Sequence, residues 1–110
     1  MSMATRRASS LLSKAEIKGK LARLKDWKLA ARGKAIRAEY SMKDFAAAIA
    51  LIGKIAKAAE AMDHHPDIHL TSYRSLALEL STHSLGGLSD NDFRLAAGIS
   101  RFPKKLKAPL

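Results

Sequence analysis

Cysteine is absent from this chain of 110 residues, which excludes disulfides, thiolate zinc sites and cysteine nucleophiles. Acidic residues are scarce as well, because ten Asp and Glu stand against twenty Lys and Arg, for a formal net charge of +10. Aromatic residues make up only 5%, so the spread positive charge lacks the base-stacking stripe typical of nucleic-acid binders. The composition favours a solvated basic surface, with a basic nucleic-acid binder as the alternative.

Long hydrophobic runs are also lacking. The longest uncharged apolar run, from Phe45 to Gly53, is too short to cross a bilayer. We therefore expect a soluble protein without a membrane partner, and the length suits one domain with one core. Residues 1–12 are predicted to be a basic N-terminal tail, residues 13–102 the domain, and residues 103–110 a C-terminal tail. The N-terminal composition also resembles a short transit peptide, so a cytoplasmic location is expected, with organelle import as the alternative.

Helix and strand signals alternate along the predicted domain. Ser13 and Glu16 form a capping box, which predicts a first helix to about residue 24. Residues 27–31 and 35–40 are predicted to be two strands of a hairpin.

The longest helix is predicted to begin after Ser41 as its N-cap, with Asp44 at the capping-box position. Five apolar residues at spacings of three and four form the stripe that we expect to face the core: Phe45, Ile49, Ile52, Ala56 and Ala59. Pro66 bounds this helix, because the residue before a proline avoids helical geometry. The helix is therefore predicted to end at residue 62 or 63.

The second half of the domain is predicted to contain a long strand over residues 73–82 and a short one near residues 68–70. Leucines alternate along the long strand, so one of its faces packs on the core. Ser89 and Asp92 form another capping box, and the helix that follows stops before Pro103. The element order predicts an α+β two-layer fold, with an antiparallel sheet of about four strands and three α-helices on one face.

Four histidines are the candidate chemical groups: His64, His65, His69 and His83. Imidazole exchanges protons near neutral pH, so converging histidines suit a dehydration, in which one group protonates a leaving hydroxyl while another removes a proton. From spacing alone, a zinc site that includes Asp63 or Asp67 is an equal alternative, although no HExxH spacing occurs. Both compete with ordinary surface histidines or a histidine pair that caps a helix.

The histidines belong to a longer pattern of residues at fixed gaps. Its members are Glu60, Asp63-His64-His65-Pro66, Tyr73, Thr82-His83, Gly86-Gly87-Leu88-Ser89 and Asp92. This pattern resembles the signature of the pterin-4a-carbinolamine dehydratases, the family that includes the dimerisation cofactor of a homeodomain transcription factor. Trp27 and residues 40–45 and 91–97 are similar to the family as well, so the resemblance covers about two-thirds of the chain, residues 27–99.

The resemblance implies an enzyme that converts 4a-hydroxytetrahydrobiopterin to quinonoid dihydrobiopterin and water by histidine acid–base catalysis, in support of tetrahydrobiopterin recycling. His64 and His83 match the acid–base pair of the family, and His65 matches the histidine that binds and orients the pterin ring.

Three further positions match the substrate-binding set of the family: Glu60, Asp92 and Trp27. In the resemblance, Asp92 is placed to orient a histidine, and Trp27 forms a wall of the pocket. His69 matches no fixed position.

The resemblance further implies that the enzyme needs neither a metal nor an organic cofactor. It implies self-association as a homodimer or homotetramer and a functional link to an aromatic amino acid hydroxylase. The alternative is a non-catalytic protein-binding module on the same fold, acting as a transcriptional coactivator or an assembly factor.

Overall fold

The computed structural model describes residues 10–108. Within them the chain forms α2 (Lys14–Leu21), β1 (Trp27–Ala30), β2 (Ala35–Ser41), α3 (Phe45–Met62), β3 (Asp67–Thr71), β4 (Ser75–Leu80) and α4 (Asp90–Arg101). Two 3-10 turns, η1 (Ala31–Gly33) and η2 (His83–Leu85), complete the element order. The predicted N-terminal tail lies mostly outside the described residues.

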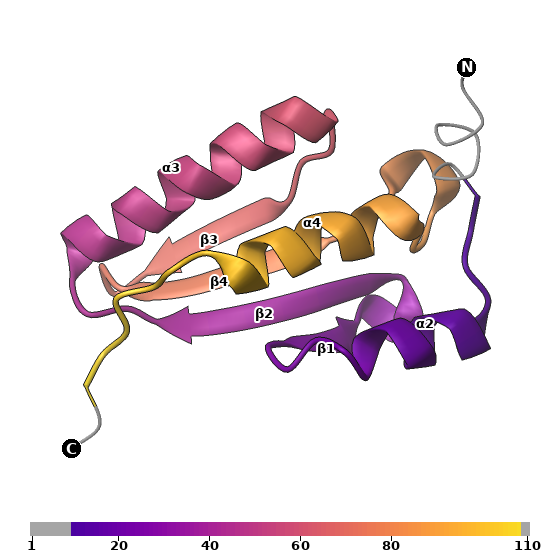
Figure 1. Ribbon diagram of the computed structural model, residues 1–110, viewed down its shortest axis with the longest axis horizontal. Coiled ribbons are helices and arrows are strands. Elements are labelled where there is room, and N and C mark those ends of the chain that lie inside the picture. The colour runs from indigo at the N-terminus through magenta and orange to yellow at the C-terminus, as the bar shows by residue number, and fades with distance from the viewer. Residues whose placement is uncertain (1–9, 109–110) are drawn as a thin grey trace.

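The described strands form one antiparallel sheet in the order β1-β2-β4-β3. Three pairs of facing residues join the central strands β2 and β4, and all six side chains are buried: Ile36 with Leu80, Ala38 with Leu78, and Tyr40 with Leu76. The helices cover this buried face (Figure 1). The predicted α+β two-layer fold is thereby confirmed.

Helices α3 and α4 lie side by side over the sheet and run in opposite directions, while α2 lies beside β1 (Figure 1). The C-terminal end of α3 is consequently next to the N-terminal end of α4. None of the described helices combines the length and the apolar character needed to cross a bilayer.

The buried face of α3 differs from the predicted stripe. Phe45 and Ile49 are 53% and 47% exposed, and the stripe that reaches the core contains Ala48, Leu51 and Ile55 together with Ala59, the one buried member of the predicted stripe. The prediction was wrong for Phe45 and Ile49 because α3 is rich in alanine, leucine and isoleucine around most of its circumference. Periodicity alone cannot choose between two overlapping apolar stripes on such a helix.

The predicted start of α3 was also wrong. Asp44 is the N-cap, since its Oδ1 accepts a hydrogen bond from the backbone N–H of Ala47 at 2.8 Å. Ser41 is still part of β2 and lies opposite Ser75. Of the other two capping boxes, that of Ser13 and Glu16 is confirmed, and it begins a helix that ends at Leu21 rather than near residue 24.

The predicted long strand is too long at both ends. Ser72 and Tyr73 have left-handed backbone angles, with φ of 48° and 54°, so they form the turn between β3 and β4 instead of continuing a strand. β4 ends at Leu80, and the predicted short strand is present as β3.

The segment after α4 lies against the β2–α3 junction. The backbone N–H of Lys43 donates to Lys105 O, and that of Lys107 donates to Ser41 O, both at 2.8 Å. Lys104 Nζ donates to three carbonyl groups at the end of α4, which stabilises the unpaired carbonyls of a helix C-terminus. Burial lowers the pKa of Lys104.

Candidate active site

The end of α3 fixes the backbone of the adjacent histidines. Asp63 adopts a left-handed conformation, with φ of 50°, and its N–H donates to the carbonyls of Ala59 and Glu60. The N–H of His64 donates to Ala59 O at 3.0 Å. The bonds from Asp63 N–H to Glu60 O and from His64 N–H to Ala59 O form a Schellman motif. Pro66 follows, and a proline cannot continue the helix. The chain therefore leaves the helix in a defined direction at His64, whose side chain contacts α4.

His64 contacts the first turn of α4. Its Nε2 lies 2.6 Å from Oδ1 of Asp92, and its side chain is only 10% exposed. A carboxylate only accepts hydrogen bonds, so Nε2 is the nitrogen that carries the proton in this contact. The other ring nitrogen, Nδ1, then remains for a ligand.

Asp92 is completely buried together with Ser89, and these are the two buried polar residues of the described chain. Oδ2 of Asp92 accepts a hydrogen bond from the Thr82 hydroxyl at 2.8 Å and from the backbone N–H of Ser89 at 2.9 Å. With the bond to His64, this buried carboxylate has three partners, as a buried charge requires. Asp92 has no exposed surface and its side chain contacts His64, so its predicted contact with the substrate stays a prediction.

His65 points to a different partner from its neighbour. Its Nε2 lies 2.6 Å from Oε2 of Glu60, one turn back on α3. Both side chains are open to solvent, with 54% and 76% of their surfaces exposed. The pair is thus accessible, and it contrasts with the buried contact between His64 and Asp92.

His83 lies in η2, directly after Thr82, and is exposed. It was predicted at the end of a strand, but β4 ends three residues earlier. Because Thr82 contacts Asp92, and Asp92 contacts His64, the chain carries His83 into the neighbourhood of His64. Three separate segments therefore meet here: the end of α3, η2 and the start of α4.

Trp27 lies elsewhere in the fold. It is 4% exposed within the hydrophobic core, and its indole N–H donates to Ser100 Oγ at 3.1 Å. Ser100 is eight residues after Asp92 on α4, about 12 Å along the helix axis. The structure does not bring Trp27 to the histidines, and its role as a pocket wall stays a prediction.

His69 lies on β3, opposite Ala77, and its side chain is exposed on the face of the sheet away from the helices. Among residues 10–108, no three histidine or acidic side chains come together in a group able to hold a metal ion.

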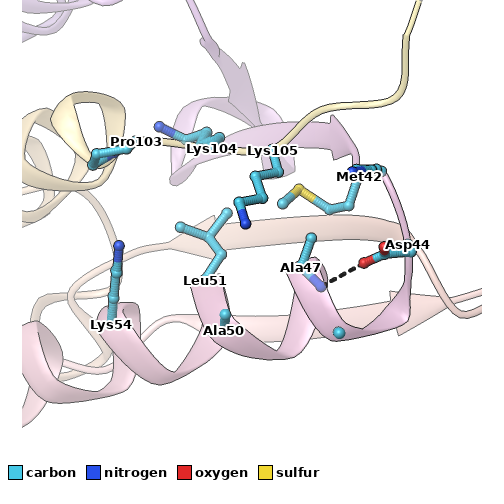
Figure 2. A pocket seen from close by; sticks show the side chains of 11 residues that line it. Met42, Asp44, Ala47, Ala50, Leu51, Lys54, Pro103, Lys104 and Lys105 are labelled. Carbon is cyan, nitrogen blue, oxygen red and sulfur yellow. Dashed lines mark hydrogen bonds between the residues drawn. The ribbon is translucent and has the colours of Figure 1, made fainter.

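A cavity of about 440 Å³ lies away from the histidines, between the N-terminal half of α3 and the segment after α4. Figure 2 shows Lys54 and Lys105 on either side of Leu51 in this cavity. Lys54 precedes His64 by ten residues, about 15 Å of helix. No histidine lines this cavity, so the candidate active site is placed at the histidines.

Sequence reasoning found the histidines and Asp92 but gave no role to Thr82. One signal was available, because Thr82 has the parity of the leucines that face the core along β4. A hydroxyl at such a position needs a polar partner.

Comparisons with known proteins point to one family. The family model described as Pterin 4 alpha carbinolamine dehydratase matches residues 10–102. A protein of Cyanothece sp., provisionally named as a pterin-4-alpha-carbinolamine dehydratase, is 41% identical over 96 residues, which cover 87% of this chain and 96% of the relative. A relative in Roseiflexus castenholzii with the same provisional name is 43% identical over 91 residues, 83% of this chain and 95% of its own.

Among solved structures, a transcriptional coactivator/pterin dehydratase from Brucella melitensis superposes with a TM-score of 0.77 at 29% identity. The match covers 82% of this chain and 95% of the Brucella chain.

Proposed function

The chain belongs to the pterin-4-alpha-carbinolamine dehydratase family, and from this premise we propose that it dehydrates 4a-hydroxytetrahydrobiopterin. The product is quinonoid dihydrobiopterin, and the physiological role is tetrahydrobiopterin recycling after an aromatic amino acid hydroxylase. The observation that carries the proposal is the contact between His64 and the buried Asp92 at 2.6 Å, beside the segment that bears His83.

The reaction needs two proton movements and no change of oxidation state. The C4a–O bond of the substrate breaks while a proton is delivered to the leaving hydroxyl, which departs as water. The N5–H bond loses its proton, and its electron pair forms the C4a=N5 double bond. His64 and His83 are the proposed acid–base pair, and imidazole suits both directions of transfer near neutral pH.

His64 is prepared for this task by its contact with Asp92, which holds the ring and fixes Nε2 as the protonated nitrogen. The arrangement follows the logic of other acid–base histidines, which a buried carboxylate holds in one tautomer and orientation. Nδ1 of His64 is accordingly the proposed atom for proton exchange with the substrate.

His65 and Glu60 are the proposed binding pair for the pterin ring. Both are exposed and hydrogen-bonded to each other, so they are accessible to the polar edge of a pterin. A pterin presents adjacent N–H donors and ring acceptors, which a carboxylate and an imidazole complement.

Self-association is part of the proposal. Phe45 and Ile49 are large apolar side chains on the exposed side of α3, and exposed apolar groups that recur on one helix face are typical of an interface. A homo-oligomer joined through α3, a dimer or a tetramer, would cover them. The relatives named above are bacterial, which favours a cytoplasmic protein over one imported into an organelle.

The test is a stopped-flow dehydration assay. A hydroxylase generates the 4a-hydroxytetrahydropterin, and the rise of the quinonoid product is followed with and without the protein. Acceleration in proportion to protein concentration is the expected result. The same rate with and without folded protein would contradict catalysis and favour the non-catalytic binding module.

A further inference from the structure

Thr82 connects the two histidines of the proposed acid–base pair. We propose that Thr82 is a positioning residue, whose hydroxyl sets Asp92 and through it His64, and whose backbone holds the turn that bears His83. The expected effect of Thr82 on turnover rests on the proposed function. Its effect on the placement of Asp92 and His64 rests on the hydrogen bonds alone.

The hydroxyl has one proton and two close neighbours. Oγ1 of Thr82 lies 2.8 Å from Oδ2 of Asp92 and 2.6 Å from Oγ of Ser89. Because the carboxylate only accepts, the Thr82 hydroxyl donates to Asp92, and the Ser89 hydroxyl then donates to Thr82. This ordered chain fixes Oδ2 on one side of the carboxylate and leaves Oδ1 directed at Nε2 of His64.

The backbone of Thr82 forms the turn of His83. Its N–H donates to Gly87 O at 2.7 Å, and its carbonyl accepts from the N–H groups of Leu85 and Gly86, both at 3.0 Å. Gly86 closes the turn with φ of 67°, a left-handed conformation that glycine adopts without strain. The residue that contacts Asp92 therefore also closes the turn in which His83 lies.

The hydroxyl has no role in packing that would explain it. Valine has nearly the same shape as threonine, and both prefer extended backbone. A valine at this position would fill the same space and remove only the donor to Asp92 and the acceptor for Ser89. Thr82→Val therefore tests the hydroxyl alone, and Thr82→Ser keeps the hydroxyl without the methyl group.

The control is Thr71→Val. Thr71 is exposed at the end of β3 and lies opposite Ser75, at the other end of the sheet. Should Thr82→Val not fold, Thr82→Ala removes the same donor with a smaller side chain, and the same comparison applies.

Two readouts separate this inference from the proposed function. The first is the ¹⁵N spectrum of the His64 ring at a pH where it is neutral, which reports the nitrogen that carries the proton. We expect the Nε2–H form in the wild type, Thr82→Ser and Thr71→Val, and a measurable loss of that preference in Thr82→Val. This readout needs no turnover, so it remains decisive even if the wild type proves inactive.

The second readout is dehydration. We expect kcat to fall by about 10- to 100-fold in Thr82→Val. A displacement of a catalytic group by about 1 Å has effects of this order. KM should change less, and Thr82→Ser should restore most of kcat. Unchanged ¹⁵N shifts of His64 and unchanged kcat in Thr82→Val would overturn the inference.

Discussion

Nε2 of His64 lies 2.6 Å from Oδ1 of Asp92, a carboxylate without exposed surface. This contact joins the end of α3 to the first turn of α4, two segments 28 residues apart in the chain. It therefore serves the fold and the proposed chemistry together. His83 is exposed, and this difference in burial separates His64 from His83.

His64→Ala and His83→Ala should differ in stability. Removing His64 leaves a buried carboxylate oxygen without its partner, which costs about 1–3 kcal/mol of unfolding free energy. His83 is exposed, so its replacement should stay within about 0.5 kcal/mol. Urea unfolding followed by circular dichroism measures both values. Equal losses in the two variants would contradict the buried contact.

Asp92→Asn should lower both stability and activity. Three donors face the carboxylate, from His64, Thr82 and Ser89, and the amide group of asparagine would present its own donor to one of them. A loss of about 1–3 kcal/mol is expected. Asp90→Asn is the matched control, because Asp90 forms a partly exposed salt bridge with Lys20, and such pairs contribute about 0–1 kcal/mol. Equal unfolding free energies of the two variants would count against the network.

The free energy of unfolding should fall at high pH because of the buried hydroxyl of Tyr40. Burial raises the pKa of Tyr40, and its hydroxyl donates to Asp26 Oδ2 at 2.8 Å, which raises it further. Above pH 10, the ordinary value for tyrosine, the unfolded chain releases this proton and the folded chain keeps it. The free energy of unfolding should then fall as pH rises, by about 1.4 kcal/mol per pH unit for this one proton.

The comparison that isolates this effect is Tyr40→Phe. The variant should lose about 1 kcal/mol near pH 7 with its hydrogen bond, and its unfolding free energy should fall less steeply above pH 10. The phenyl ring keeps the contact with Lys104, whose Nζ lies 5.0 Å from the ring centroid of Tyr40. Parallel curves for the two proteins above pH 10 would contradict the assignment.

Ile49→Asp should reduce the oligomer proposed above. Ile49 is 47% exposed on α3, and a carboxylate there would be buried without a partner in an interface through this helix. Light scattering should give a smaller mass for Ile49→Asp than for the wild type. Lys57→Asp, on an exposed part of the same helix, is the control for charge. An unchanged mass in Ile49→Asp would place the interface elsewhere or remove it.

The layers of the fold could be predicted from sequence because Leu76, Leu78 and Leu80 alternate along β4 and capping signals mark the helices. The buried face of α3 could not, since Ile49 and Ile52 compete there with Leu51 and Ile55 for the core. Only packing on α4 and the sheet decides between the two stripes.

The candidate site was predictable in its histidines and in Asp92 through the spacing of the pattern. Its internal connections were not. The adjacent residues His64 and His65 face different acids, one buried and one exposed, and this follows from the left-handed turn at Asp63. No local signal in the sequence specifies that turn, because glycine is the usual residue there.

The measurement that tests the central claim most directly is the stopped-flow dehydration assay applied to His83→Ala beside the wild type. His69→Ala is the matched control, since His69 is exposed on the opposite face of the sheet. We expect acceleration by the wild type and by His69→Ala, and a loss of about 10²-fold or more in His83→Ala, as for a general acid–base group. Equal acceleration by all three proteins would contradict the proposed site, and no acceleration by the folded wild type would contradict the enzyme.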